Sequence, residues 1–319
     1  MAKTLGAFRA ALVIGWLMLT AAGLLYARMR SIPSWAAVPA LAAFLVEYPF
    51  YLVPAFPELR KRLAGPILPP FLILSVLTPY VTCYAAIGHL QLASVLELAV
   101  FPLVVGVWYL VLPVNMVFDL AFLALLGFFL IGGYFNRIYV SFYAALPIAI
   151  LGRLALFRTV AMVLMLERRV PETGYGFVPN GREWRIGVLH YLYFLPVAAC
   201  LALPLGAVRF ASPAPLWKTL GIFLAFLWVV ALFEEFVFRG VLQPWLERWT
   251  GHPWAGLLVA SLVFGAVHLW FRTFPNWRWA LLAAILGWFC GRARNQAHSI
   301  RAGMVTHALA VATWRGFFV

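Results

Sequence analysis

Two adjacent glutamates and an arginine stand at the end of a strongly apolar stretch, which reads LFEEFVFRG over residues 232–240. Keeping both carboxylates ionised in lipid would cost roughly 5–7 kcal/mol unless they are paired. Glu235 precedes Arg239 by four residues, an orientation that favours a helical ion pair. Glu234 points to a different helix face and has no such partner. We therefore predict that Glu234 is the carboxylate available to act as a general base.

Two histidines follow in separate apolar runs. His268 closes the run FGAVH at 264–268, and His307 lies within GMVTHALA at 303–310. A single histidine in an apolar helix is more often a core residue, but two of them downstream of an acidic pair can converge in a helical bundle. One glutamate and two histidines can hold a divalent metal such as zinc, or activate water without one. If a metal is involved, Glu234, His268 and His307 are its expected ligands.

Other readings of these residues are weaker. The acidic pair and Arg239 alone would also suit an interfacial ion pair that anchors a helix end. The sequence has no GxSxG and no HExxH motif, which disfavours a serine hydrolase and a zincin. The three cysteines are isolated in apolar runs and give no thiolate zinc site. Structural roles are expected for three further acids, either in interhelical hydrogen bonds or in a pair with a basic residue such as Arg153: Glu47, Glu97 and Asp119.

The elements that position these residues must be membrane helices. Hydrophobic residues make up 65% of the 319-residue chain and charged residues only 11%, whereas soluble domains carry about a quarter charged residues. The net charge of +14 is spread over short basic clusters between apolar runs, such as 60–62 and 168–169. Such clusters suit membrane orientation and anionic headgroups rather than nucleic acid. We expect an all-α, polytopic bundle in contact with the lipid bilayer and no nucleic-acid partner.

Apolar runs of about the length of a membrane span recur along the whole sequence. The run at 139–165 contains Arg153 and Arg158, so an interfacial amphipathic helix is the alternative there. We expect about 8–11 transmembrane helices, the first retained rather than cleaved as a signal. The candidate runs are 10–27, 35–54, 66–88, 92–112, 117–134, 139–165, 187–206, 217–243, 253–271, 278–291 and 303–317.

The longest polar stretch, ERRVPETGYGFVPNGREWR at 167–185, contains several prolines and glycines and is the best domain boundary. We divide the chain into an N-terminal transmembrane helical region, residues 1–170, whose role is unassigned, and a C-terminal helical core, residues 174–319. All the residues proposed for chemistry lie in the second part.

The ordered set Glu234-Glu235-x-x-x-Arg239, Phe264-x-x-x-His268 and His307 resembles the CPBP family of membrane endopeptidases, also called the CAAX protease or Abi family. The resemblance covers about residues 174–319. It implies a conical bundle that cleaves peptide bonds near the membrane, either as a glutamic protease or with a metal. By this resemblance Glu234 is the general base assisted by His268, while Glu235 and Arg239 hold the helix end. His307 would bind or polarise the scissile carbonyl.

One position departs from the family pattern. The family has Asn or Asp four residues after the last histidine, and this sequence has Val311. A helical donor for the oxyanion is therefore missing, so that Thr306 or Thr313 replaces it or activity is lowered or lost. Extended bacterial members are implicated in processing C-terminal sorting tails, which makes a membrane-anchored protein or peptide in a bacterial inner membrane the expected substrate. A catalytically inactive membrane scaffold and a proton-coupled transporter remain the alternatives, and the oligomeric state stays open.

Overall fold

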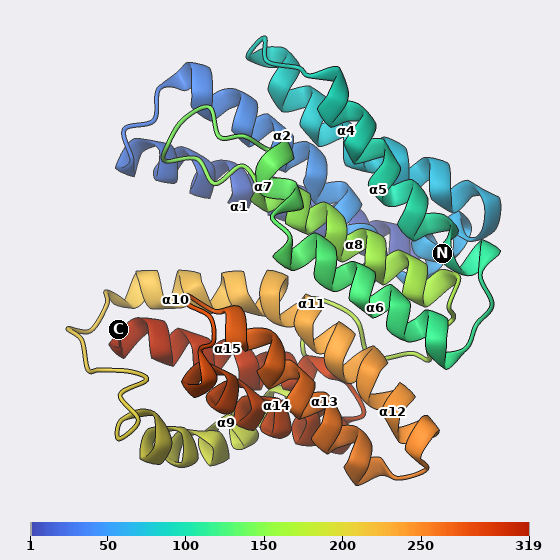
Figure 1. Cartoon of the computed structure of the whole chain (residues 1–319). Helices are drawn as coiled ribbons and strands as arrows, with labels where there is room; N and C mark the ends of the chain where they lie inside the picture. The colour runs from blue at the N-terminus through green and yellow to red at the C-terminus, as the bar shows by residue number, and fades with distance from the viewer. Residues whose placement is uncertain (1, 319) are drawn as a thin grey trace. The chain divides into compact units, whose positions relative to one another are not determined.

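A computed structural model describes residues 2–318, and within that range the chain is helical apart from its loops and one isolated bridge between Phe210 and Phe318. No strand occurs among these residues. The helices form two compact units, Met1–Arg169 and Val170–Val319, coloured blue to green and yellow to red in Figure 1. The predicted all-α class is confirmed. The boundary between the units falls inside the polar stretch 167–185.

Within the described residues, seven helical segments are long and apolar enough to cross a membrane, as expected of a multi-pass membrane protein. The expected range of 8–11 is higher because four of the expected runs do not qualify as spans. The run at 117–134 forms a shorter apolar helix, the run at 139–165 forms the 17-residue helix Ile150–Leu166, and the last two helices carry several arginines. The seven segments are Thr4–Met29, Ser34–Ala55, Gly65–Ala86, Leu92–Val111, Gly181–Ala202, Leu216–Thr250 and Pro253–Trp270.

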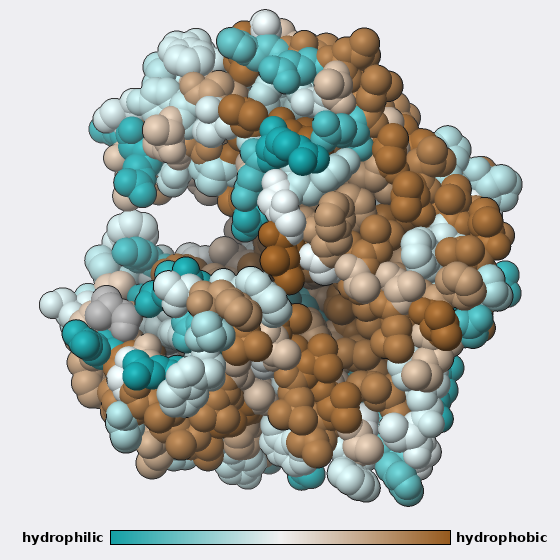
Figure 2. Space-filling view, viewed as in Figure 1, coloured by the Kyte–Doolittle hydropathy of each residue, from teal (hydrophilic) through white to brown (hydrophobic). Residues whose placement is uncertain are grey.

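The outer surfaces of both units carry large apolar side chains. Leu17, Val111 and Leu216 are 68%, 74% and 83% exposed, and Figure 2 shows hydrophobic residues covering much of the visible surface of each unit. Contiguous apolar surface of this kind is rare on soluble monomers, where water would solvate it. Lipid is therefore the solvent that this surface fits.

In the N-terminal unit, α8 (Ile150–Leu166) is the most deeply buried helix. It packs against α2 (Ser34–Leu52), α4 (Leu68–Ala86) and α5 (Leu92–Val111). The alternative of an interfacial amphipathic helix for 139–165 is wrong, because α8 is buried on most of its circumference. The remaining helices of this unit are α1 (Ala2–Met29), α3 (Pro57–Arg60), α6 (Met116–Ile131) and α7 (Tyr134–Ile138).

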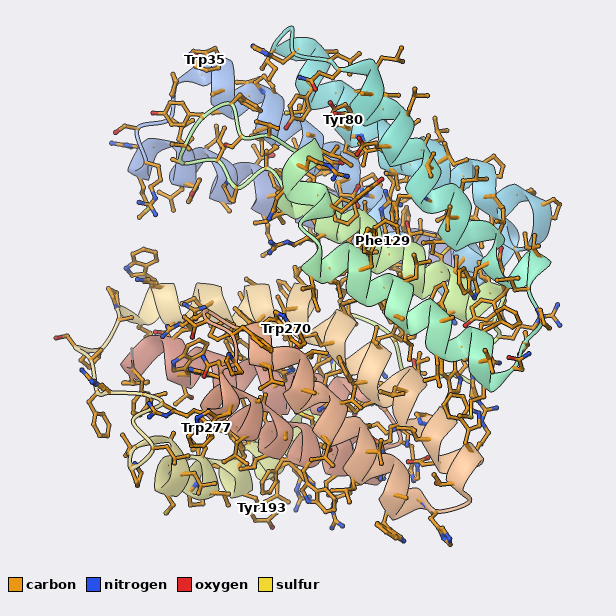
Figure 3. The ribbon with its side chains drawn as sticks, viewed as in Figure 1. Trp35, Tyr80, Phe129, Tyr193, Trp270 and Trp277 are labelled. Atoms are coloured by element: carbon orange, nitrogen blue, oxygen red, sulfur yellow. The ribbon has the colours of Figure 1, made fainter. Side chains whose placement is uncertain are left out.

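Aromatic side chains fill the spaces between these helices. Tyr80 of α4 stacks on Tyr84 with ring centroids 4.4 Å apart, and Tyr139 meets Tyr80 edge-on at 5.5 Å. Phe129 of α6 packs edge-to-face on Phe101 of α5 at 4.9 Å. Tyr80 and Phe129 are labelled in Figure 3. Such edge and offset contacts stabilise packing beyond the area that they bury.

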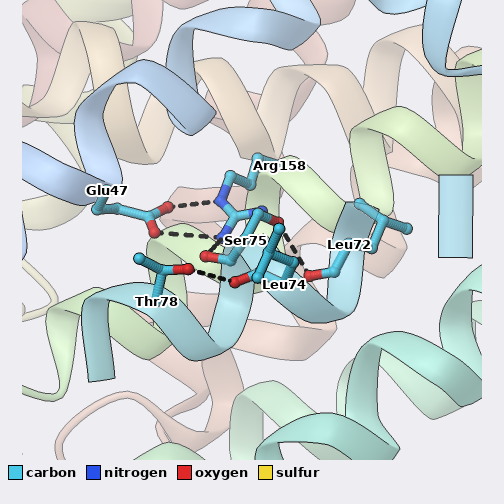
Figure 4. Close-up of polar contacts among 6 residues, drawn as sticks. All are labelled: Glu47, Leu72, Leu74, Ser75, Thr78 and Arg158. Carbon is cyan, nitrogen blue, oxygen red and sulfur yellow. Dashed lines mark hydrogen bonds and ion pairs between the residues drawn. The ribbon is translucent and has the colours of Figure 1, made fainter. Parts of the chain in front are cut away.

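A buried ion pair ties three of these helices together (Figure 4). Arg158 of α8 donates from Nε to Glu47 Oε1 at 2.6 Å and from Nη2 to Glu47 Oε2 at 3.2 Å. Its other donors reach Ser75 Oγ at 2.6 Å and the Ser75 carbonyl at 2.8 Å. The expected partner Arg153 is exposed instead. Because the guanidinium has four oxygen acceptors, two from Glu47 and two from Ser75, this pair has the geometry that a buried charge requires.

The C-terminal unit is built around α14 (Trp277–Ala297), which contacts α9 (Gly181–Ala202), α13 (Pro253–Val267) and α15 (Ile300–Phe317). An Asn180–Glu183 capping box starts α9, and Ser299 caps the start of α15. Gly187 lets α9 approach α15 closely, since a Cβ there would lie 2.6 Å from the Ala302 carbonyl oxygen. The unit therefore brings α15 against α9 and α14 along its length.

Replacing Arg158 by methionine should lower the free energy of unfolding by about 3–5 kcal/mol, because Glu47 would remain as an unpaired buried charge. The exposed pair Arg137–Glu97, with side chains 70% and 43% exposed, gives the matched control. Arg137→Met should cost less than about 1 kcal/mol. The measurement is SDS-induced unfolding of the purified proteins in detergent micelles, and equal losses in the two variants would contradict this account.

Candidate active site

One continuous helix, Leu216–Thr250, carries the acidic pair. It consists of α10 (Leu216–Ala225), the π-helical segment η4 (Phe226–Val230), α11 (Ala231–Glu235), a second π-helical segment η5 (Phe236–Leu242) and α12 (Gln243–Thr250). Figure 1 shows this helix running along one side of the C-terminal unit. π-Helical turns are rare and occur often at functional sites. Here they lie directly before and after the short helix that ends in the two glutamates.

Glu235 lies inside the bundle, where its carboxylate is shared by two cationic or polar neighbours. Arg239 approaches Glu235 Oε1 to 3.3 Å, and His307 Nδ1 lies 3.0 Å from the same oxygen. Both Glu235 and Arg239 are essentially fully buried. The Arg239 guanidinium also lies 4.3 Å from the centroid of the Phe264 ring, a cation–π contact. The i, i+4 pair expected from the spacing is thus present.

Glu234 faces the other way, into a cavity. Its side chain is 27% exposed, and Oε2 has no hydrogen-bond partner among the described residues. The nearest cationic candidate is His307, whose Nε2 lies 3.7 Å from Glu234 Oε2. The two adjacent glutamates therefore differ in exposure: Glu235 is fully buried against Arg239 and His307, whereas the Glu234 side chain is partly exposed to the cavity.

His307 of α15 lies between the two carboxylates, with one ring nitrogen toward each. Thr306, next to it, is fully buried and donates to the Gly187 carbonyl oxygen at 2.9 Å. Gly303 provides the space for Glu235, since a Cβ there would lie 2.7 Å from Glu235 Oε2. Small residues on α15 thus allow the histidine and the buried acid to meet.

His268 follows the last residue of α13 as its C-cap and lines the same cavity. Its Nδ1 lies 2.7 Å from the Phe264 carbonyl oxygen. A carbonyl oxygen only accepts, so Nδ1 carries the proton in this bond and Nε2 is left with a lone pair. The Phe264 ring packs against both histidines, with centroids 4.8 Å from His268 and 5.7 Å from His307. Phe264 therefore spaces the two imidazoles.

The cavity has a volume of about 360 Å³ and lies within the C-terminal unit. Glu234, His268 and His307 contribute polar groups to a wall that is otherwise mainly apolar. Most of the remaining wall residues come from α9, η4, α14 and α15 and include Phe194, Phe226, Leu286 and Val311. Three polar groups from three distant parts of the sequence thus share one apolar cavity, while Glu235 and Arg239 lie behind it.

The expected metal ligands are not those that the structure gathers. Among the described residues, the His, Cys and acidic side chains with ligand atoms all within 4.8 Å of one another are Glu235, Cys290 and His307. Cys290 carried no signal in the sequence beyond its apolar surroundings. The set fits a divalent cation poorly, because Glu235 Oε1 already faces Arg239 and that buried positive charge would repel the ion.

Val311, which stands where the family resemblance expects a hydrogen-bond donor, lines the cavity. Thr306 cannot replace the missing donor, since its hydroxyl is buried and bonded to backbone carbonyls. Thr313 does line the cavity, and its Oγ1 lies 2.6 Å from the Tyr191 hydroxyl. Sequence reasoning had no means to identify Tyr191, because it comes from α9, far from the motifs.

Residues 216–313 match the family model described as "Type II CAAX prenyl endopeptidase Rce1-like". The match contains all five residues Glu234, Glu235, Arg239, His268 and His307 and begins after α9, so it is narrower than the expected range of resemblance, 174–319. No curated protein and no solved structure matches the chain.

Substituting the two adjacent glutamates by glutamine should separate their roles in stability. Glu235→Gln should lower the free energy of unfolding by about 3–5 kcal/mol, because Arg239 would lose its buried counter-charge. Glu234→Gln should change it by less than about 1 kcal/mol, since Glu234 Oε2 makes no hydrogen bond. Denaturant midpoints of the purified variants in detergent give the comparison, and the reverse order would show that the assignment of the two carboxylates is wrong.

Proposed function

We propose that the protein is an intramembrane endopeptidase, because residues 216–313 match the model of the Rce1-like type II CAAX prenyl endopeptidase family. It would hydrolyse a peptide bond in a membrane-associated protein or peptide. The observation that carries the proposal is that Glu234, His268 and His307 line one largely apolar cavity. The fixed pair Glu235–Arg239 lies directly behind them.

Glu234 is the general base in this proposal. Its Oε2 has no hydrogen-bond partner and its side chain is partly exposed to the cavity, so a water molecule there can donate a proton to it. His268 offers the lone pair of Nε2 as a second acceptor, which would orient the same water. An apolar wall excludes bulk water and strengthens these interactions.

His307 stabilises the negative charge that develops on the oxygen of the scissile carbonyl. With His307 protonated, the four groups Glu234, Glu235, Arg239 and His307 sum to zero net charge, which suits their burial. Nδ1 then donates to Glu235 and Nε2 presents an N–H near the cavity, in reach of an oxyanion. After attack, Glu234 returns the proton to the leaving amine, so that the base is restored. No metal is needed in this sequence of steps.

The apolar cavity and the surrounding lipid-facing helices favour an apolar peptide segment that enters from the bilayer. A C-terminal tail is the simplest such substrate, because it has one free end to thread into the cavity. The resemblance to extended bacterial members of the CPBP family also leads us to propose a bacterial inner membrane as the location of the protein. The N-terminal unit, residues 1–169, has no assigned chemistry in this proposal.

An inactive scaffold is the second candidate, and Val311 is the observation that favours it. The residue offers no hydrogen-bond donor at a cavity position where the family resemblance expects Asn or Asp. Under this alternative the wild-type protein cleaves none of the tested peptides, and Glu234 substitutions leave its cellular function unchanged.

Glu234→Gln should lower kcat/KM for peptide cleavage by about 10²- to 10⁴-fold, the range expected for loss of a general base. Glu247→Gln, the same change on the same continuous helix at a residue paired with Arg294, should leave the rate unchanged. The assay follows cleavage of prenylated and acylated peptides in proteoliposomes by mass spectrometry. A metal chelator should leave wild-type cleavage unchanged, and full activity of Glu234→Gln would rule out its role as the base.

A further inference from the structure

A pair of hydroxyl groups lies where α15 and α9 meet beside the cavity. Thr313 of α15 lines the cavity, and its Oγ1 lies 2.6 Å from the hydroxyl oxygen of Tyr191 of α9. The Tyr191 ring packs against a buried cluster that includes Phe194 and Leu286 of the cavity wall. Thr313 therefore presents the hydroxyl pair to the cavity, and Tyr191 supports it from outside the wall.

This pair contains two hydroxyl protons and uses one of them. Each hydroxyl has a single proton to donate, so one O–H stays available whichever oxygen accepts. A phenol is the stronger donor and an aliphatic hydroxyl the stronger acceptor, which assigns the shared proton to Tyr191. Thr313 then keeps its own O–H for a partner in the cavity.

The Thr313 hydroxyl does not return its proton to its own helix. Thr78, Thr82 and Thr250 each donate to the carbonyl oxygen four residues earlier, at 2.7–2.8 Å. Such local bonds are the usual choice of a threonine within a helix, yet in the described part of the chain Thr313 is bonded only to Tyr191. The contact with Tyr191 thus leaves the proton of Thr313 without an acceptor.

A second donor on the same wall also has no acceptor. Trp314 follows Thr313 and lines the cavity, and its buried Nε1 has no hydrogen-bond partner among the described residues. Buried donors are almost always satisfied in folded proteins. Two successive residues of α15 therefore offer unused donors to one cavity, which indicates that a ligand supplies the acceptors.

The geometry of α15 separates Thr313 from the bond that is broken. Thr313 follows His307 by six residues, which is roughly 9 Å along the helix axis at 1.5 Å per residue. Both side chains lean toward the N-terminus of the helix, so they do not converge. An oxyanion that accepted from both would have to lie about 3 Å from each donor. Thr313 therefore does not replace the donor that is missing at Val311.

We propose that Thr313, oriented by Tyr191, donates a hydrogen bond to a main-chain carbonyl of the substrate two or three residues from the scissile bond. The proposal rests on the endopeptidase function above. An extended peptide advances about 3.3–3.6 Å per residue, so that roughly 9 Å corresponds to two or three residues. A peptide carbonyl in an apolar cavity has lost its water and requires a donor. Because the contact is to the backbone, it sets the register of the substrate without selecting a side chain.

The test is a thioamide scan with full-length protein in proteoliposomes. The probe is the prenylated or acylated peptide that wild type cleaves fastest, with one carbonyl at a time replaced by C=S, a weaker acceptor. In wild type, one thioamide two or three residues from the cleaved bond should raise KM about 3- to 10-fold with kcat little changed, the effect of one neutral hydrogen bond. Thr313→Val should raise KM for the unmodified peptide by a similar factor and be insensitive to that thioamide. Thr313→Ser should restore both properties.

The role of Tyr191 as a positioning residue has its own variant. Tyr191→Phe should raise KM about 2- to 5-fold, because the Thr313 hydroxyl can then turn to the Leu309 carbonyl oxygen. Tyr193→Phe is the matched control: Tyr193 lies on the same helix, is 53% exposed and is labelled in Figure 3. It should leave both KM and the thioamide effect unchanged.

A disturbance of α15 packing is controlled by Thr219→Val, since Thr219 lies against α15 at Gly316 and does not line the cavity. This variant should behave as wild type. Thioamide effects of the same size in wild type and Thr313→Val at every position would overturn the proposal, because Thr313 would then have a structural role only. A difference confined to the scissile carbonyl would also overturn it and would assign Thr313 to the oxyanion.

Binding measurements separate this subsite from the catalytic proposal. Fluorescein-labelled peptides and their thioamides are titrated with the Glu234→Gln protein, with and without Thr313→Val, and followed by anisotropy. A thioamide that raises Kd only where Thr313 is present supports the subsite even if wild type cleaves no peptide. Equal thioamide effects on Kd in the two proteins at every carbonyl reject the subsite and leave the endopeptidase assignment standing if wild type cleaves.

Discussion

An ionised carboxylate inside a membrane protein is costly unless a counter-charge or a polar cavity stabilises it. This constraint organises the C-terminal unit. Glu235 is shared by Arg239 and His307, and all three are buried. The cost of ionising Glu235 is offset by these contacts. Glu234, one residue earlier, makes no such bond and opens onto the cavity. The difference between two neighbouring acids is therefore created by the helices packed against them.

The buried ionic groups of the protein differ in how fully they are hydrogen-bonded. In the N-terminal unit Arg158 has acceptors from Glu47 and Ser75 on nearly all of its donors, which suits a structural tie between helices. Both carboxylate oxygens of Glu167 in the same unit have no hydrogen-bond partner among the described residues. In the C-terminal unit the same is true of Glu234 Oε2, of Glu235 Oε2 and of both Arg239 Nη atoms. Unsatisfied groups that line or border a cavity are where a substrate can supply the missing interactions, whereas a satisfied pair has nothing left to offer.

The helical class and the ion pair Glu235–Arg239 could be predicted because each depends on local spacing: runs of about 20 apolar residues, and an acid four residues before a base. The convergence of Glu234, His268 and His307 could be proposed only from their residue types, since no periodicity shows which helices pack together. The burial of α8, the pairing of Glu47 with Arg158 rather than Arg153, and the approach of Cys290 to Glu235 depend on tertiary packing and had no sequence signal. The roles assigned to the site residues remain proposals.

The central claim is that Glu234 activates water directly, without forming a bond to the substrate. A single-turnover cleavage in H₂¹⁸O, with enzyme in excess and the product analysed by mass spectrometry, tests it most directly. Direct attack by water places ¹⁸O in the new carboxyl terminus of the product in the first turnover. A first-turnover product that carries only ¹⁶O, with the label appearing in the Glu234 side chain instead, would show that Glu234 is a nucleophile and would contradict the account.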